Sequence, residues 1–487
     1  MMTNEPTHIY DYLHKQALDR PDKPALICDD RTLTFKELSD EVNQMAAYMA
    51  NQIGEQTGQQ VVALLLSNSW QFVVAHLGTL QAGHIVMPID PTYKKLEVSG
   101  ITDQQKPVHV ITTKALASEF DPSLPITTID DLPWRGAKTD LAFLRLPADK
   151  QAATLLFTSG TTGKPKITAY SHSNHMWNSS VVAPLWKWND ADTILLSTPL
   201  SHWHGLAVIL NGALLIGNTV YIQERFDPEK TLTKLASGDI TLYMHVPIAY
   251  YKMVEHAPEK TYDLSKVRLF VSGSSYLPPD IWQQFKDRFG HEILERYGSS
   301  ETGLIASNPL DERLPGSVGY VLPGVELRIQ EDGEIAMKSP GLFMGYYGNP
   351  EATAAKTIED GFWLTGDIGD FENGDKTARF KLRGRVQEKM KKNGYTLFPR
   401  DLEWAIMHNE HVADAFVLGL TGENALSDTL VYFLVTDLSE AEIQAYCKEN
   451  LPAAWRPDRI VFLPEIPKSP AGKPKLAKLK ESLKETD

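Results

Sequence analysis

The most informative segment for chemistry is a short loop rich in glycine, threonine and lysine. Residues 155–166 read LLFTSGTTGKPK, so an apolar run typical of a buried strand precedes small hydroxylated residues, glycines and lysines. Glycine lets a backbone approach a polyphosphate, hydroxyl and N–H groups donate to its oxygens, and lysine offsets its charge. The spacing is not that of a Walker A loop, because Pro165 stands where a helix should begin. The segment predicts a phosphate-binding loop of another class.

Further polar motifs follow this loop along the chain. They are PLSHWHG at 199–205, GSS at 273–275, YGSSE at 297–301, LTGD at 364–367, GR at 384–385 with KKNG at 391–394, and GK at 472–473. Together they offer carboxylates, hydroxyls, an arginine and lysines, which are groups that bind phosphate, ribose hydroxyls or a hard cation. No Ser-His-Asp signature accompanies them, so the motifs favour nucleotide chemistry over nucleophilic catalysis by a side chain.

These motifs together resemble those of the adenylate-forming (AMP-binding) enzymes, which include acyl-CoA synthetases, adenylation domains of peptide synthetases and beetle luciferases. One such motif would be weak evidence, but the whole set recurs in order between residues 158 and 473. By this resemblance the chain is identified as a member of the acyl-CoA synthetase branch. The segment 294–319 is most similar to malonyl-CoA synthetases, and the overall pattern is also similar to fatty-acyl-CoA synthetases.

The resemblance implies a ligase reaction with two steps in one site. A carboxylate attacks the α-phosphorus of ATP and gives an acyl-adenylate and pyrophosphate. The C-terminal domain then rotates, and a thiol, usually that of coenzyme A, attacks the mixed anhydride and releases AMP. The protein supplies alignment and charge neutralisation. The expected cofactors are therefore ATP/AMP, Mg²⁺ and coenzyme A.

The resemblance also implies the catalytic residues, which are Thr158, His202, Glu301 and Lys473. Glu301 matches the Mg²⁺-binding glutamate, because a hard cation favours carboxylate and phosphate oxygens. Lys473 would stabilise the charge on the α-phosphate and the attacking carboxylate while the adenylate forms. In this reading Glu301 is the one metal ligand.

The nucleotide-binding residues that the resemblance implies come from every motif. They are Ser159, Gly160, Thr161, Thr162, Gly163, Lys166, Gly273, Ser274, Ser275, Arg296, Tyr297, Gly298, Ser300, Asp367, Arg385, Lys391 and Gly394. Tyr297 would stack near adenine. Asp367 would accept hydrogen bonds from the ribose hydroxyls, and Arg385 would contact ribose and phosphate.

Several positions depart from the family pattern. Ile167 replaces a glycine after Lys166, Ser201 replaces an aromatic residue, and Ser300 replaces a threonine but keeps its hydroxyl. Gln387 occupies the hinge position that is usually Asp or Lys. These departures bear on loop closure and domain rotation more than on the type of reaction.

The acid substrate is left open by the sequence. The expected pocket residues are His202, Lys252, Arg296 and Leu304, and the neighbouring aliphatic side chains favour a fatty acid. A malonyl-CoA synthetase is the alternative, since a dicarboxylate needs a buried cation, although Lys252 cannot form the bidentate contact of an arginine. There are two further alternatives. One is an enzyme that transfers the acyl group to a carrier-protein thiol, and the other is a non-catalytic, nucleotide-binding relative of these enzymes. Amino-acid activation is disfavoured, because no acidic residue lies between Ser201 and Tyr221.

Alternating apolar runs and helical patterns must position these residues. The run at 61–66 predicts a strand, 70–80 a helix, and 108–112 and 267–271 two more strands, which is typical of parallel sheets that bind ligands at their carboxyl ends. The fold class is therefore α/β, with a large N-terminal domain of parallel-sheet subdomains and a small C-terminal α+β domain on a hinge. The expected domains are 1–386 and 387–487, with Gln387 at the hinge.

Within the C-terminal part, Pro399 predicts the start of a helix that runs to about His408. Strands are expected at 413–420 and 429–435. Ser439 and Glu442 predict a capping box ahead of a helix through Cys447.

Composition excludes several classes of protein. The 487 residues include 42% hydrophobic and 23% charged residues, which suits a globular chain. A net charge of −14 argues against a protein that coats nucleic acid or an anionic membrane. The two cysteines do not form a C-x-x-C pair, and the apolar runs are too short to span a bilayer. We expect a cytoplasmic enzyme, a monomer or homodimer, with small-molecule partners, possible use of an acyl-carrier protein, and neither nucleic acid nor integral membrane association.

Overall fold

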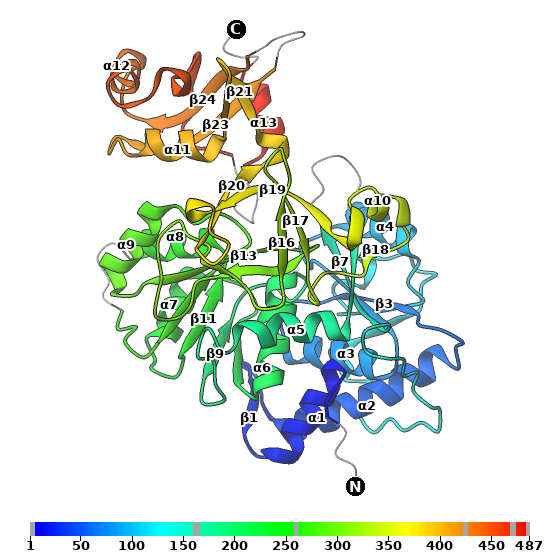
Figure 1. Cartoon of the computed structure of the whole chain (residues 1–487). Helices are drawn as coiled ribbons and strands as arrows, with labels where there is room; N and C mark the ends of the chain where they lie inside the picture. The colour runs from blue at the N-terminus through cyan, green and yellow to red at the C-terminus, as the bar shows by residue number, and fades with distance from the viewer. Residues whose placement is uncertain (1–4, 159–165, 258–261, 422–426, 468–473, 484–487) are drawn as a thin grey trace. The chain divides into compact units, whose positions relative to one another are not determined.

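The computed structural model describes residues 5–158, 166–257, 262–421, 427–467 and 474–483 (Figure 1). It contains two compact units, one made of residues 1–315, 321–326 and 338–361 and the other of residues 316–320, 327–337 and 362–487. The expected hinge at Gln387 lies inside the second unit. The domain boundary between residues 386 and 387 therefore stays a prediction about which part of the chain rotates during the reaction. Among the described residues, no helix is both long enough and apolar enough to cross a membrane.

Two mainly parallel sheets form the first unit. One has the order β18 (Gly345–Tyr346), β8 (Lys166–Ser171), β7 (Ala152–Thr158), β4 (Ile85–Ile89), β3 (Val61–Leu65), β5 (His109–Thr112) and β6 (Ile126–Thr128). The other has the order β15 (Tyr320–Val321), β14 (Gly303–Ser307), β13 (Ile293–Ser299), β12 (Leu269–Ser272), β11 (Leu242–His245), β9 (Thr193–Leu196), β10 (Thr219–Ile222), β1 (Pro24–Ile27) and β2 (Thr32–Thr34). The central strands of both sheets pair in parallel, which confirms the predicted α/β class.

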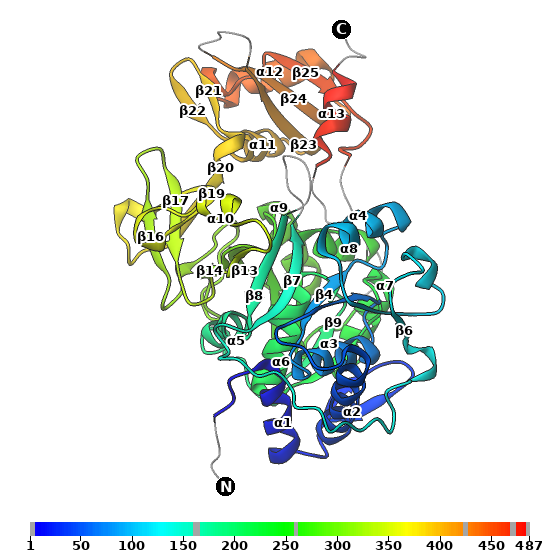
Figure 2. The same ribbon diagram turned by 90° about the vertical axis from the view of Figure 1, so that its right-hand side faces the viewer.

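Helices connect these strands. They are α1 (Ile9–Asp19), α2 (Phe35–Ile53), α3 (Trp70–Gln81), α4 (Lys95–Gln105), α5 (His172–Val182), α6 (Asn211–Ile216), α7 (Pro228–Leu235), α8 (Pro247–His256), α9 (Pro279–Phe289) and α10 (Pro350–Ala354). The predicted helix at 70–80 is α3, which begins where the Ser69 side chain accepts a hydrogen bond from the backbone of Phe72. Helices α2 and α3 lie side by side in both views (Figure 2). A Cβ at Gly78 would meet the Met45 side chain, so this close approach requires glycine.

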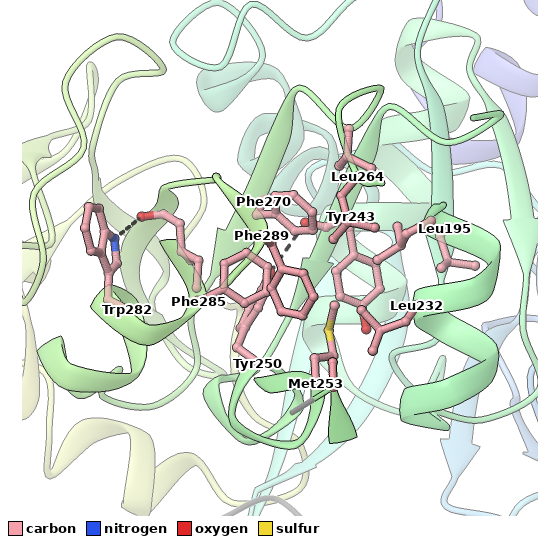
Figure 3. Packing of buried hydrophobic residues seen from close by; sticks show 14 of the residues in the cluster. Leu195, Leu232, Tyr243, Tyr250, Met253, Leu264, Phe270, Trp282, Phe285 and Phe289 are labelled. Carbon is pink, nitrogen blue, oxygen red and sulfur yellow. Dashed lines mark hydrogen bonds between the residues drawn. The ribbon is translucent and has the colours of Figure 1, made fainter. Parts of the chain in front are cut away.

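An aromatic core holds the strands that carry the middle motifs. Figure 3 shows Tyr243, Tyr250, Phe270 and Phe285 packed against one another between β11, β12 and helices α8 and α9. The Tyr250 hydroxyl also donates to the carbonyl of Val271 at 2.6 Å. The core therefore holds the ends of β11 and β12 in place, and the loop 273–275 follows directly after β12.

The second unit contains the expected α+β elements. Most of one antiparallel sheet belongs to it, in the order β16 (Glu326–Ile329), β17 (Glu334–Lys338), β19 (Trp363–Phe371) and β20 (Phe380–Arg385). It is followed by β21 (Met390–Lys392), β22 (Tyr395–Leu397), α11 (Pro399–Met407), β23 (Val412–Leu420), β24 (Thr429–Thr436), α12 (Glu440–Asn450), β25 (Arg459–Phe462) and α13 (Leu476–Ser482). The capping box of Ser439 and Glu442 at the start of α12 is confirmed.

Buried histidines form a cluster in the first unit. His76 on α3 and His172 and His175 on α5 are 0% exposed, and the rings of His172 and His8 are 4.7 Å apart. Burial, followed by the effect of His175, lowers the pKa of His76 to about 3, and burial lowers that of His175 to about 3. These side chains are therefore neutral in the folded protein at any pH near neutrality.

We expect this cluster to make the first unit sensitive to acid. Below the ordinary histidine pKa of about 6.5 the unfolded chain binds protons that the folded chain does not, so stability falls by about 1.4 kcal/mol per pH unit for each such histidine. The loss begins near pH 6.5 and continues toward the folded-state values. Urea unfolding of the wild type and of His76→Met between pH 7.5 and 5 tests this. The variant should have the shallower pH dependence, and an equal slope would contradict the prediction.

Candidate active site

The predicted phosphate loop connects two paired strands. Strands β7 and β8 are antiparallel, with Phe157 opposite Ile167 and Thr158 opposite Lys166. Ser159, Gly160, Thr161, Thr162 and Gly163 lie outside the described residues, as does the side chain of Thr158. Ile167 is 2% exposed and packs in the core of this sheet, which explains how an isoleucine replaces the usual glycine.

Glu301 shares the neighbour Tyr346 with Lys166, the first described residue after this loop. Its carboxylate accepts hydrogen bonds from the Tyr346 hydroxyl at 3.1 Å and from the Ser299 hydroxyl at 3.2 Å. Lys166 Nζ lies 4.8 Å from the centroid of the Tyr346 ring. Burial, together with the Glu301 carboxylate, raises the pKa of Tyr346 well above its usual range, so its hydroxyl stays a donor.

Tyr346 is a residue of this site that the motifs did not reveal. It reaches Glu301 because β18 pairs with β8, with Tyr346 opposite Thr168. The two partners are 45 residues apart in sequence. To identify Tyr346 as a site residue from the sequence, one would need evidence that β18 pairs with β8, the strand after the phosphate loop.

The surroundings of Glu301 suit a magnesium ion. Its carboxylate is partly exposed and held by neutral hydroxyl donors, and such an oxygen ligand fits a hard cation. No group of three or more acidic, histidine or cysteine side chains in the described part of the chain could hold a metal. A single carboxylate that leaves the other positions to phosphate oxygens and water is an ordinary Mg²⁺ site.

We expect Glu301→Gln to weaken this function while leaving the fold intact. The glutamine oxygen can still accept one of the two hydrogen bonds from Tyr346 and Ser299, and its NH2 group can donate to the other hydroxyl, but the side chain loses the charge that attracts the cation. The Mg²⁺ concentration for half-maximal adenylation should rise about tenfold or more, at least as much as when an outer-shell partner of a metal ligand is lost, and the thermal midpoint should change little. Tyr346→Phe is the matched control, since it keeps the carboxylate and should shift the Mg²⁺ requirement less.

Strand β13 carries the predicted nucleotide-binding residues Tyr297 and Gly298. A Cβ at Gly298 would lie 2.1 Å from the carbonyl oxygen of Gly303, so the bulged pairing of β13 with β14 requires glycine there. Tyr297 is 7% exposed. In the loop after β12, Gly273 packs against the Arg296 side chain, Ser274 has a φ of 73°, and Ser274 and Ser275 are exposed.

Arg296 is a buried cation of the first unit. It is 4% exposed, and none of the described residues offers its Nε or Nη2 a hydrogen bond. Its guanidinium lies 5.8 Å from the Trp203 ring, and a Cβ at Gly273 would lie 2.5 Å from its Nε. Burial lowers its pKa to about 10, so it remains a cation at neutral pH.

The other expected pocket residues lie in different environments. His202 is half exposed and pairs with Asp90, at the end of β4, with 3.5 Å between Nε2 and Oδ2. Burial opposes ionisation of Asp90, but hydrogen bonds from His202 and Thr92 lower its pKa to about 2. Leu304 is fully buried on β14, whereas Lys252 is exposed on α8. Of the two candidate cations, only Arg296 is buried.

In the second unit, two expected nucleotide contacts are neighbours. Asp367 lies opposite Arg385 in the pairing of β19 with β20, and the Arg385 Nε is 3.3 Å from its carboxylate. Asp367 is 7% exposed, and its N–H donates to the Thr365 hydroxyl. Gly366, with a φ of 80°, donates its N–H to the Glu334 carboxylate. This turn explains the Thr-Gly-Asp spacing.

The remaining expected residues follow β20. Gln387 lies in the short 3₁₀ helix Val386–Glu388. Lys391 is exposed on β21, and Gly394 has a φ of 83° in the turn between β21 and β22. Lys473 lies outside the described residues, so its role stays a prediction.

Comparison with known proteins gives two family matches. The AMP-binding enzyme profile matches residues 13–347, and the AMP-binding enzyme C-terminal domain profile matches residues 401–473. The first match alone covers more than half of the chain.

Curated relatives and solved structures are similar over almost the whole chain. A human mitochondrial malonate–CoA ligase, ACSF3, is 26% identical over 94% of this chain and 89% of the relative. A long-chain-fatty-acid–CoA ligase of Bacillus subtilis is 28% identical over 93% and 90%. The crystal structure of ATP-bound MatB from Rhodopseudomonas palustris superposes with a TM-score of 0.89 at 27% identity and covers 99% of both chains.

Proposed function

The chain belongs to the AMP-binding enzyme family and is an acyl-CoA ligase, and on that premise we propose that its acid substrate is a short dicarboxylate. Enzymes of this class use ATP, Mg²⁺ and coenzyme A. In the first step a carboxylate oxygen bonds to the α-phosphorus of ATP and pyrophosphate leaves. In the second step the thiol sulfur bonds to the acyl carbon and AMP leaves.

The residues of the chain have separate tasks in this proposal. Glu301 would hold Mg²⁺, which when bound neutralises charge on the phosphate oxygens. Asp367 would accept hydrogen bonds from the ribose, and Lys473 would stabilise the charge near the α-phosphate. Gln387 would be the point about which residues 387–487 rotate between the steps.

The buried Arg296 guanidinium is the observation that carries the choice of substrate. A buried cation with two nitrogens that have no hydrogen-bond partner among the described residues is costly unless a ligand supplies acceptors. A carboxylate at the far end of the acid would supply both charge and acceptor oxygens. The fatty acid expected from the sequence would leave this arginine unpaired beside an aliphatic chain.

The short chain length is proposed from the named relatives. They include the human mitochondrial malonate–CoA ligase and a malonate–CoA ligase of Arabidopsis thaliana, both of which act on a short dicarboxylate by name. Arg296 would meet the second carboxylate of such an acid.

The named relatives include malonate–CoA and long-chain-fatty-acid–CoA ligases, so they support either a dicarboxylate or a fatty acid as the substrate. The long-chain acid ranks second because it would supply no acceptor for the buried Arg296 guanidinium. A carrier-protein thiol as acceptor, a monomer or homodimer, and a cytoplasmic location stay predictions.

A panel of acids in an ATP–pyrophosphate exchange assay tests the proposal. Malonate, methylmalonate, succinate and glutarate are compared with propanoate, butanoate, octanoate and palmitate, with and without coenzyme A. A short dicarboxylate should give the highest kcat/KM and yield AMP, pyrophosphate and the acyl-CoA. Preference for a monocarboxylate would overturn the choice of substrate, and ADP with phosphate as products would overturn the reaction.

A further inference from the structure

Asp90 and His202 form a contact between the two sheets of the first unit. Asp90 directly follows β4 of one sheet, and His202 lies in the loop after β9 of the other. The His202 Nε2 is 3.5 Å from the Asp90 Oδ2, and the two side chains are 52% and 18% exposed, respectively. Such contacts are often long before a substrate binds and shorten in the complex. The pair is therefore an Asp–His arrangement that a substrate can reach.

The pair lies at the edge of the sheet where the predicted phosphate loop begins. Strands β4 and β7 run parallel, with Val86 opposite Thr154 (Figure 2). Strand β4 ends at Ile89 and β7 ends at Thr158, so the two strands reach the same edge. Parallel sheets bind their ligands at this carboxyl edge. Asp90 thus follows β4 on the side of the first unit where the reaction is expected.

The backbone of the loop after β9 is held by another residue. Asn68, which follows β3, is 7% exposed and donates its side-chain NH2 to the Thr198 carbonyl at 3.1 Å. Its side-chain oxygen accepts the N–H of Leu200 at 2.8 Å. Because these bonds fix the loop, the contribution that remains for Asp90 is the orientation of the His202 ring.

The two oxygens of the Asp90 carboxylate have separate partners. Oδ1 accepts the N–H of Thr92 at 2.9 Å and the Thr92 hydroxyl at 2.7 Å, whereas Oδ2 faces His202. With a pKa of about 2, Asp90 is ionised at neutral pH, and an ionised carboxylate can only accept hydrogen bonds. The His202 Nε2 therefore carries a proton, and in the neutral ring the other nitrogen, Nδ1, is an acceptor.

The second step of an acyl-CoA ligase releases a proton. The thiol sulfur bonds to the acyl carbon, the bond between this carbon and the phosphate oxygen breaks, and its electron pair leaves with AMP. The proton of the S–H group must go to a base. A free thiol has a pKa of about 8.5, so it is mostly protonated at neutral pH, whereas the thiolate is the nucleophile. A neutral imidazole with a free acceptor nitrogen is the side chain that most often takes such a proton.

We propose that Asp90 is a positioning residue of the thiol-transfer step and holds His202 so that its Nδ1 takes the proton of the coenzyme A thiol. His202 is then the catalytic base, and its half-exposed ring passes the proton to solvent. Asp90 fixes the tautomer and stabilises the positive charge that forms on the ring, as a carboxylate does in other Asp–His pairs. The inference needs the acyl-CoA ligase activity but not the choice of a dicarboxylate, because the same thiol reacts with every acyl-adenylate.

Asp90→Asn tests this inference through the tautomer of the ring. Because Thr92 donates twice to one oxygen, it keeps the carboxamide oxygen on its own side and turns the NH2 group toward His202. The ring must then accept at Nε2 and carry its proton on Nδ1, where it cannot take the thiol proton.

Single-turnover assays of the two half-reactions, with the acid that gives the highest rate in the exchange assay, measure the effect. At pH 7.5 the thioester step of Asp90→Asn should slow about tenfold or more, since general-base catalysis contributes roughly 10²–10⁴-fold. ATP–pyrophosphate exchange should change less than about threefold, because adenylation releases no thiol proton. Asp103→Asn is the matched control, since Asp103 is exposed on α4 in the same unit, and it should leave both half-reactions unchanged.

Two further measurements separate a base from a structural residue. At about pH 9.5, above the pKa of a free thiol, the thiolate forms without a base, so the defect of Asp90→Asn should shrink to less than about threefold. Nitrogen NMR of the histidine rings should show a proton on Nε2 of His202 in the wild type and on Nδ1 in Asp90→Asn. The His202 signal is identified by its loss in His202→Gln.

His202→Gln also tests the base independently of Asp90, because glutamine cannot take the proton. It should slow the thioester step at least as much as Asp90→Asn, and the double variant should be no slower than His202→Gln alone. Equal losses of Asp90→Asn in both half-reactions, or a thioester defect that persists at high pH, would overturn the inference. Additive losses in the double variant would do the same, because they would show that Asp90 does not act through His202.

Discussion

Replacement of Arg296 by leucine is expected to lower kcat/KM for the preferred dicarboxylate by about two to three orders of magnitude. Removing one partner of a buried, hydrogen-bonded charge pair costs about 2–5 kcal/mol, and each 1.36 kcal/mol is a factor of ten. Activity toward short monocarboxylates should be kept or improved, since leucine removes a charge that these acids cannot pair. The ratio of the two activities in the exchange assay is the measurement.

Arg225→Leu is the matched control, because Arg225 is exposed in the loop between β10 and α7 and lies in the same unit. It should leave both activities unchanged. A loss of equal size for dicarboxylates and monocarboxylates in Arg296→Leu would indicate a folding defect or a role in nucleotide binding. The thermal midpoint distinguishes these two, because only a folding defect lowers it.

Lys252→Met belongs to the same experiment. The sequence predicts Lys252 and Arg296 as the two cations of the pocket, whereas the Lys252 side chain is exposed on α8. A higher KM for the dicarboxylate in this variant would show that Lys252 contributes to the substrate site. Unchanged kinetics would leave Arg296 as the cation that selects the acid.

The second large effect is expected at Lys473. Lys473→Ala should reduce adenylate formation about a hundredfold or more, comparable to the loss of one preorganised donor at a developing charge. It should spare thioester formation from a supplied acyl-adenylate. The reason is that the cation is needed only while negative charge rearranges at the α-phosphate, and the second step begins after pyrophosphate has left.

Single-turnover assays of the two half-reactions measure this difference. Lys478→Ala is the control, since Lys478 lies on the exposed side of α13 and is one of several lysines near the end of the chain. Equal losses in both half-reactions would rule out a specific role of Lys473 in adenylation. A loss in the thioester step alone would assign this lysine to thiol transfer.

Much of the local structure follows from the sequence alone. The apolar run at 61–66 is β3, the helical spacing at 70–80 is α3, and Pro399 begins α11, because periodicity, caps and proline act over a few residues. The motifs also identified the family and the reaction class, since their residue types and spacing are set by the chemistry of ATP. These properties need no knowledge of which distant segments meet.

The tertiary structure decided which side chains share an environment. Tyr346 contacts Glu301 because β18 pairs with β8, and His202 contacts Asp90 although the two are far apart in sequence. It also distinguished two cations that the sequence treats alike. Arg296 is buried, and two of its nitrogens have no hydrogen-bond partner in the described part of the chain, whereas Lys252 faces solvent. Burial, strand pairing and pKa depend on long-range packing, and no local pattern of residues encodes them.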